Sequence, residues 1–95
     1  METLFSLGRL LATPGALDAA NRAGENLLLF FCRHAAGDWG NMDPDDGQAN
    51  DAAVRDGERI LSAYPLDPAA PRNGTVWVIT EADRSMTTLL CPDEY

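Results

Sequence analysis

His34 is the residue of this sequence best suited to acid/base chemistry near neutral pH. It is the only histidine of the chain, and an unperturbed imidazole titrates between pH 5 and 8. A carboxylate beside the ring would complete a general acid/base pair. Asp38 and Glu81 are the candidates, so a small hydrolase or toxin that uses His34 with Asp38 or Glu81 is one hypothesis. The simpler interpretation, which we favour, is a hydrogen-bonded histidine at a helix C-terminus, where the helix dipole favours the charged ring.

Trp39 and Ser85 are two further residues that could do chemistry or bind a partner. Trp39 stands in Gly37-Asp38-Trp39-Gly40, and a half-buried indole is a common anchor at protein interfaces. An indole also fills a large volume in a core, and we favour that role. Ser85 lacks the G-x-S-x-G pattern of a nucleophile elbow, so we expect a turn residue, with Arg84 pairing to Glu81, Asp83 or Asp38.

The stretch from residue 38 to residue 58 carries most of the negative charge. It contains seven acidic residues and one arginine, Arg55, which leaves six net negative charges of the eight in the whole chain. The acidic residues are Asp38, Asp43, Asp45, Asp46, Asp51, Asp56 and Glu58. Such a surface either keeps the protein soluble or binds a basic partner. Carboxylates three or four residues apart on a helix are ~5–6 Å apart at Cβ, which allows mimicry of nucleic-acid phosphates.

Metal and cofactor sites are not predicted. Asn41, Asp43 and Asp45 follow the first half of an EF-hand loop, but Asp46 replaces the required glycine and Ala52 the bidentate glutamate. The sequence has no cysteine and histidine set for zinc and no glycine-rich phosphate loop. We therefore expect no metal and no cofactor.

Length and composition predict one soluble domain spanning residues 1–95. The chain is 45% apolar, and domains of ~100 residues hold a single core. The longest apolar run, Leu27 to Cys32, is far shorter than the ~20 residues that cross a bilayer. We expect a cytoplasmic protein without a membrane contact, with Cys32 and Cys91 as buried thiols. The net charge of −8 disfavours direct binding to nucleic acid.

Capping and periodicity predict three helices in the first half of the chain. The first begins at Pro14 after the N-cap Thr13 and stops near Gly24. The second spans residues 25–36 and should be the most deeply buried, because it is apolar on nearly every side. The third spans residues 44–56, with alanines 49, 52 and 53 as its contact stripe and its aspartates outward.

The second half predicts strands, because the apolar period changes to about two after Gly57. The expected strands are 59–66, 75–81 and 85–91, with a turn at Pro68–Gly74 that contains an Asn-Gly pair. The extended segment 4–12 is a candidate fourth strand. The fold class is therefore α+β, with a three- to four-stranded antiparallel sheet, a C-terminal meander, packed against two or three N-terminal helices.

Several motifs resemble a family of small uncharacterised bacterial proteins that are often encoded on plasmids and integrated mobile elements. The shared motifs are Arg33-His34 with Gly37-Asp38-Trp39-Gly40, Leu61-Ser62-Ala63-Tyr64, Ile79-Thr80-Glu81-Ala82-Asp83-Arg84-Ser85, Thr87-Thr88-Leu89-Leu90 and the Pro92-to-Tyr95 end. The resemblance extends from Phe5-Ser6-Leu7-Gly8 through Thr13-Pro14-Gly15-Ala16 to the C-terminus. It implies a mobile-element setting and transfers no catalytic residue.

These observations lead to the hypothesis of a non-enzymatic acidic binding protein of a mobile element. It would contact a basic surface of a nucleic-acid-handling or host-defence complex as an inhibitor or regulator, in the manner of an anti-CRISPR protein or a DNA mimic. The predicted binding residues are Asp38, Trp39, Asp43, Asp45, Asp46 and Asp51. A homodimer joined through the edge of the strand at residues 59–66 stays open as an alternative.

Overall fold

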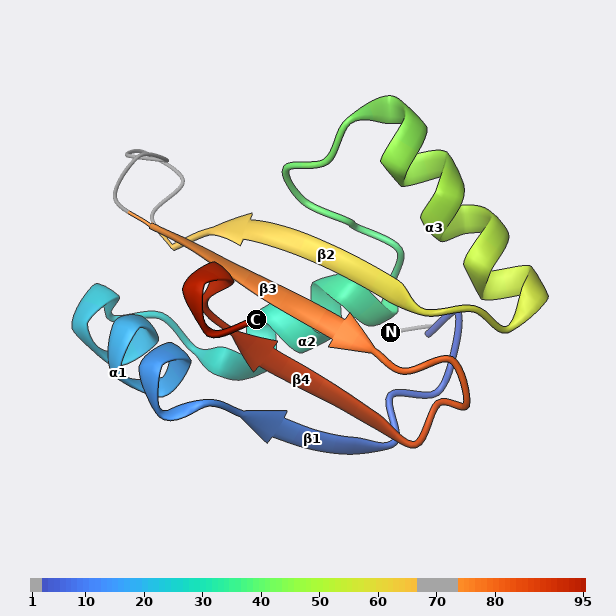
Figure 1. Ribbon diagram of the computed structural model, residues 1–95. Coiled ribbons are helices and arrows are strands. Elements are labelled where there is room, and N and C mark those ends of the chain that lie inside the picture. Colours follow the sequence, from blue (N-terminus) through green and yellow to red (C-terminus); the bar gives the residue numbers. More distant parts are fainter. Residues whose placement is uncertain (1–2, 67–73) are drawn as a thin grey trace.

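The computed structural model describes residues 3–66 and 74–95. In this part of the chain the elements are, in order, β1 (Arg9–Ala12), α1 (Pro14–Ala23), α2 (Leu27–Ala35), α3 (Pro44–Asp56), β2 (Ile60–Pro65), β3 (Thr75–Thr80), β4 (Met86–Leu90) and the 3-10 turn η2 (Pro92–Glu94). The architecture is the predicted α+β class, with the three helices preceding the strands of the meander (Figure 1). The predicted turn at Pro68 to Asn73 lies outside the described residues.

The sheet has the strand order β1-β4-β3-β2. The pairs β2–β3 and β3–β4 are antiparallel, which confirms the meander. The N-terminal segment does supply a fourth strand, but β1 runs parallel to β4, with Arg9 beside Met86. The sheet is therefore mixed, and its first strand pairs with its last across most of the chain.

Caps set the ends of the helices. The side chain of Thr13 accepts a hydrogen bond from the amide of Ala16, 3.1 Å, and Gly24 ends α1 in the left-handed conformation. The N–H of Glu25 donates back to the carbonyl of Ala20 at 2.9 Å, as a helix C-terminal motif requires. Glu25 is therefore part of the end of α1, and α2 begins after its own cap, Asn26, two residues later than predicted.

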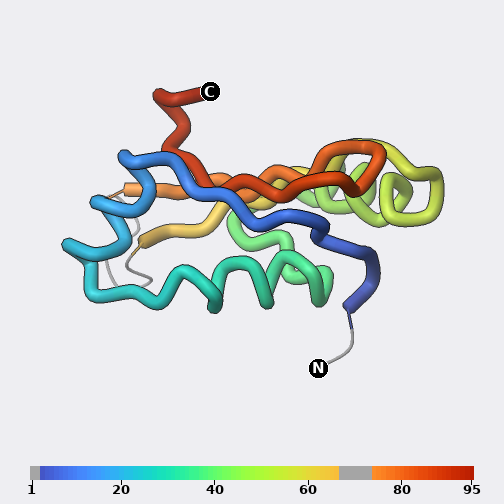
Figure 2. Tube along the Cα trace, turned by 90° about the horizontal axis from the view of Figure 1, so that it is seen from below, coloured from blue at the N-terminus to red at the C-terminus, as the bar shows by residue number. Residues whose placement is uncertain are grey.

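Helices α1 and α2 lie against one face of the sheet, and the C-terminal segment lies on the other (Figure 2). Phe30 and Phe31 of α2 are buried in the main core with Tyr64, and the rings of Phe30 and Tyr64 stack. The outer side of α2 is nevertheless open, since Leu28 is 58% and Leu29 50% exposed. The prediction that α2 is the most deeply buried element is therefore wrong for its outer side. Only the side that faces the sheet is covered by the rest of the protein.

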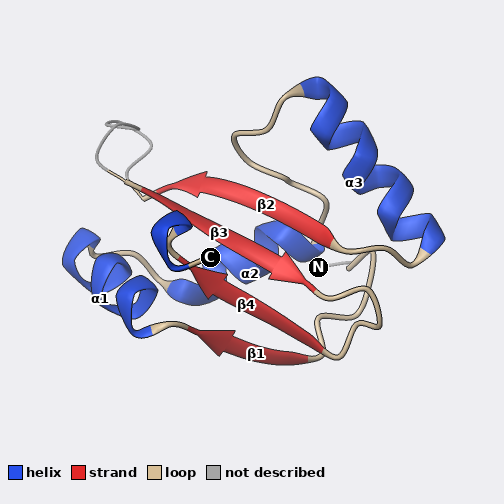
Figure 3. Ribbon diagram, viewed as in Figure 1, coloured by secondary structure: helices blue, strands red, loops and turns tan. Residues whose placement is uncertain are grey.

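Helix α3 lies beside the outer edge of β2 and not over the face of the sheet (Figure 3). A second, smaller core of Trp39, Ala53 and Ile60 holds it there. Asn50 and Ala53 are its buried residues, whereas Ala49 is exposed, so the predicted alanine stripe is only partly correct. Within the described residues, no helix has the length and apolar character needed to cross a membrane.

Candidate functional site

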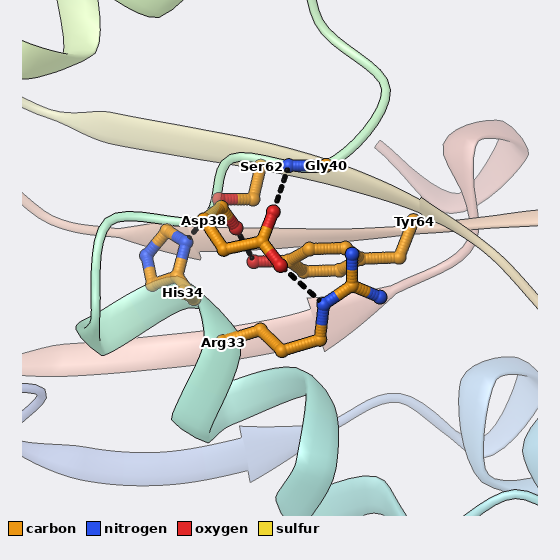
Figure 4. Close-up of polar contacts among 6 residues, drawn as sticks. All are labelled: Arg33, His34, Asp38, Gly40, Ser62 and Tyr64. Carbon is orange, nitrogen blue, oxygen red and sulfur yellow. Dashed lines mark hydrogen bonds and ion pairs between the residues drawn. The ribbon is translucent and has the colours of Figure 1, made fainter. Parts of the chain in front are cut away.

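His34 lies in the last turn of α2 and has no exposed surface. Its Nδ1 is 2.5 Å from Oγ of Ser62 on β2, and its Nε2 is 2.9 Å from Oγ1 of Thr80 on β3. Figure 4 shows the ring turned toward the sheet and toward Ser62. The histidine is therefore hydrogen-bonded, as the simpler sequence interpretation predicted, but in the interior of the protein.

The hydroxyl groups around the ring determine which nitrogen carries the proton. Thr87 donates to the carbonyl oxygen of Leu7 at 2.7 Å, and a carbonyl can only accept. The hydroxyl of Thr80, 2.7 Å from that of Thr87, must then donate to it. The oxygen of Thr80 is left to accept from Nε2–H of His34, and Nδ1 accepts from Ser62. The ring is the neutral Nε2–H tautomer.

Burial, and to a smaller extent the positive charge of Arg84, together lower the pKa of His34 to about 4. The expected stabilisation of a charged ring by the dipole of α2 is therefore outweighed. The reason is geometric, since the ring points into the interior and away from the solvated helix end, where a dipole would favour the cation.

The structure does not bring His34 together with Asp38 or Glu81. Oδ2 of Asp38 accepts from Nε of Arg33 at 2.7 Å, and its Oδ1 accepts from the amide of Gly40 at 3.1 Å (Figure 4). The hydrogen bond from Arg33 is the main cause that lowers the pKa of Asp38. Both ring nitrogens of His34 face hydroxyl groups instead. The predicted acid/base pairs of His34 with these carboxylates are wrong, because Asp38 closes the turn after α2 on the solvent side.

The pair of Ser62 and His34 resembles a nucleophile and its base by distance alone. Neither side chain has any exposed surface, so a substrate cannot reach the serine. Among the described residues, every buried side-chain nitrogen and oxygen has a hydrogen-bond partner. The chain of hydroxyls thus satisfies polar groups in the core.

Trp39 is 8% exposed and packs in the smaller core. Its indole N–H donates to Oδ1 of Asp51 at 3.0 Å, and its ring stacks on Phe5. The structure supports the core role that we favoured, and a contact between Trp39 and a partner stays a prediction. Asp51 is an exposed residue of α3. By accepting the indole hydrogen bond, its Oδ1 holds α3 against the loop that contains Trp39.

Asp43, Asp45 and Asp46 are exposed around the first turn of α3. The ion pairs found among residues 3–66 and 74–95 join Arg22 to Asp18 and Arg33 to Asp38, and neither involves these three aspartates. The positive end of the helix dipole stabilises the negative charges there. The three carboxylates therefore face solvent, as predicted for Asp45 and Asp46.

Two structural residues were not recognised in the sequence. Arg84 was expected to pair with a carboxylate, but its Nη2 donates to the carbonyl of Ala53 at 2.9 Å and its Nη1 to that of Glu58 at 2.6 Å. It thereby caps the end of α3 from the β3–β4 turn.

Ser85 is a turn residue as expected, since its amide donates to Oδ1 of Asp83 at 3.0 Å.

Asn50 is the second of these residues, because it closes the outer edge of β2. Its amide group donates to the carbonyl of Leu61 at 2.7 Å and accepts from the Leu61 N–H at 3.2 Å. The loop between α2 and α3 pairs with Ala63 in the same way. The N–H of Ala63 donates to the carbonyl of Trp39, and its carbonyl accepts from the amide of Asn41. The predicted dimer edge at residues 59–66 is therefore already occupied at these two positions.

Neither cysteine forms a disulfide, and Cys32 is exposed on α2, not buried as predicted. In the described part of the chain, no cluster of three histidine, cysteine, aspartate or glutamate residues is arranged to hold a metal ion.

Comparison with known proteins gave no match to a family model, to a curated protein or to a solved structure. The resemblance to a mobile-element family stays an expectation.

Proposed function

We propose that this chain is a non-enzymatic binding protein that presents the acidic end of α3 to a basic surface of a protein partner. The observation that carries the proposal is the placement of α3. One side of the helix is fixed to β2 through Asn50 and Ala53, and Asp43, Asp45 and Asp46 are left exposed. No ion pair among the described residues neutralises these three carboxylates.

Fixed carboxylates suit this role better than mobile ones. Trp39, bonded to Asp51, and Arg84, bonded to Ala53, attach α3 at two points along its length. The acidic residues are thus held at helical spacing, and little conformational entropy is lost on binding. Electrostatic complementarity of this kind accelerates association and weakens as salt is added.

A partner with a matching basic surface is expected among proteins that handle nucleic acid. Their phosphate-binding surfaces are rich in lysine and arginine. A row of carboxylates on a helix can occupy such a surface, so the protein would act as an inhibitor or regulator of a nucleic-acid-handling or host-defence complex. The mobile-element setting implied by the motifs agrees with that role.

The test is affinity capture of the tagged chain from its host lysate at low and at moderate salt, with the double variant Asp45→Asn/Asp46→Asn beside the wild type. Asp51 is left unchanged, because its loss would also release Trp39. We expect a nucleic-acid-binding protein to be captured at low salt, lost at moderate salt, and lost with the double variant.

The matched control is Asp83→Asn/Asp93→Asn, which removes the same charge from exposed positions outside α3. An asparagine at position 83 keeps the oxygen that accepts from Ser85. Capture should be unchanged in this control. If both pairs of substitutions reduced capture equally, net charge and not α3 would be responsible, and the proposal would be wrong.

A further inference from the structure

A groove lies between α1 and the start of α2, separate from the acidic end of α3. Its volume is about 550 Å³ and it is open to solvent. Leu17 and Ala20 of α1 and Leu27 of α2 supply apolar lining, and Asp18 and Glu25 supply carboxylates. In Figures 1 and 2, α1 and α3 are at opposite ends of the molecule, so the groove and the acidic end of α3 are two different surfaces.

The groove is formed by the fold and needs no rearrangement to open. The bond from the Glu25 amide to the carbonyl of Ala20 fixes the sharp turn between the helices, and Asn26 caps α2 directly after it. Leu17 is 46% exposed, whereas Ala20 on the same helix is 1% exposed and packs in the main core. Leu17 therefore presents apolar surface at a concave site, and binding pockets are lined mainly by such side chains.

The charge of the groove selects its occupant. Of the residues that line it, Asp18 and Glu25 are charged and both are negative. The nearby Arg22 is already paired with Asp18 at 2.9 Å. An acidic segment would be repelled, and a purely apolar one would leave the carboxylate of Glu25 without a partner.

We propose that this groove binds a short segment of a partner protein in which an apolar side chain is flanked by lysine or arginine. The apolar side chain packs on Leu17 and Leu27, and a basic group beside it pairs with the carboxylate of Glu25. The inference goes beyond the proposed function of α3, and either surface can bind when the other does not.

The experiment is a titration of the full ¹⁵N-labelled chain with a synthetic helical peptide that has leucines on one face and lysines beside them. A second peptide of equal length, with glutamates in place of the lysines, is the charge control. The lysine peptide should shift the amide signals of Leu17, Asn21 and Leu27, and the glutamate peptide should not. Shifts confined to α3 would overturn the groove proposal and leave the proposed function standing.

Two leucine variants separate the groove from general apolar binding. Leu17→Ser removes apolar lining and should weaken the lysine peptide about tenfold. Leu29→Ser removes a leucine that is 50% exposed but does not line the groove, and it should change the affinity by less than about twofold. Equal weakening by both variants, or no shift at the groove with either peptide, would overturn the proposal.

Glu25→Gln is a further variant that keeps the shape of the side chain. It should weaken binding of the lysine peptide at low salt and have little effect at high salt, because the lost attraction is screened there. A preserved amide spectrum establishes that each variant is folded. Unchanged affinity of Glu25→Gln at low salt would contradict the charge selection.

Discussion

Ser62 donates a hydrogen bond to Nδ1 of His34 across 2.5 Å, and this contact joins β2 to α2 inside the core. On the other side of the ring, the hydrogen bonds from Thr80 to Thr87 and from Thr87 to the carbonyl of Leu7 require the neutral Nε2–H tautomer. Because His34 is the only histidine, its ring nitrogens can be assigned without ambiguity by two-bond ¹H–¹⁵N NMR. We expect a protonated Nε2 and an unprotonated Nδ1 at pH 7. A protonated Nδ1 would contradict the assigned direction of the hydroxyl chain.

Ser62→Ala should destabilise the protein, because Nδ1 of His34 would lose its donor at a site with no exposed surface. The expected loss in the free energy of unfolding is about 1–3 kcal/mol, measured by urea denaturation. Ser6→Ala is the matched control, since Ser6 is exposed and its change should stay within about 0.5 kcal/mol. Similar losses in the two variants would mean that the buried bond contributes little.

The buried ring also predicts how stability depends on pH. The pKa of His34 is about 4 in the folded protein against 6.5 for the free side chain, so between these values the unfolded state binds the extra proton. The contribution of His34 is complete well above pH 6.5 and declines as the pH falls through that value. The free energy of unfolding should drop by roughly 1.5 kcal/mol between pH 6.5 and 5.

This pH window separates His34 from the carboxylates. Asp38 and Glu94 also have lowered pKa values, caused mainly by their hydrogen bonds to Arg33 and Thr13, but their contributions are lost only as the pH falls below the ordinary carboxylate range. In His34→Gln the slope between pH 6.5 and 5 should be much reduced. Parallel curves for the variant and the wild type would show that another group titrates.

The local parts of the fold could be predicted from the sequence, and the contacts between distant segments could not. Asp43-Pro44 and Gly57 mark both ends of α3, which spans the predicted residues. Parallel pairing of β1 with β4 leaves no local pattern, because the partners are more than 70 residues apart. The burial of His34 did have a signal, since it follows Phe30 and Phe31 by four and three residues and therefore shares their face of the helix.

Arg84 and Asn50 illustrate the limit for single residues. A polar residue in an acidic helix or in a charged turn has the composition of solvent-exposed surface, and its role depends on which backbone groups the tertiary structure leaves unpaired. Only the position of α3 beside β2 shows that the Leu61 amide and the Ala53 carbonyl need these two partners.

Arg84 adopts a left-handed backbone conformation, φ 61°, although it is not glycine. Arg84→Ala removes the hydrogen bonds to Ala53 and Glu58 and keeps the backbone strain, whereas Arg84→Gly removes both. We expect both variants to be less stable than the wild type by about 1–3 kcal/mol, with the alanine variant less stable than the glycine variant by roughly 0.5–1 kcal/mol. Thermal or urea unfolding measures the order, and a more stable alanine variant would contradict the strain.

Asn50→Ala should both destabilise the protein and open the edge of β2. The N–H and carbonyl of Leu61 would lose their partners, at a cost of about 1–3 kcal/mol, and an exposed strand edge promotes pairing between molecules. Gln48→Ala is the matched control, because it removes an exposed amide from the same helix and should change stability by less than about 0.5 kcal/mol. Urea unfolding and sedimentation equilibrium at several concentrations measure the two effects. If Asn50→Ala had the oligomeric state of the wild type and the stability of Gln48→Ala, closure of the edge would depend on the loop at Ala63 and not on Asn50.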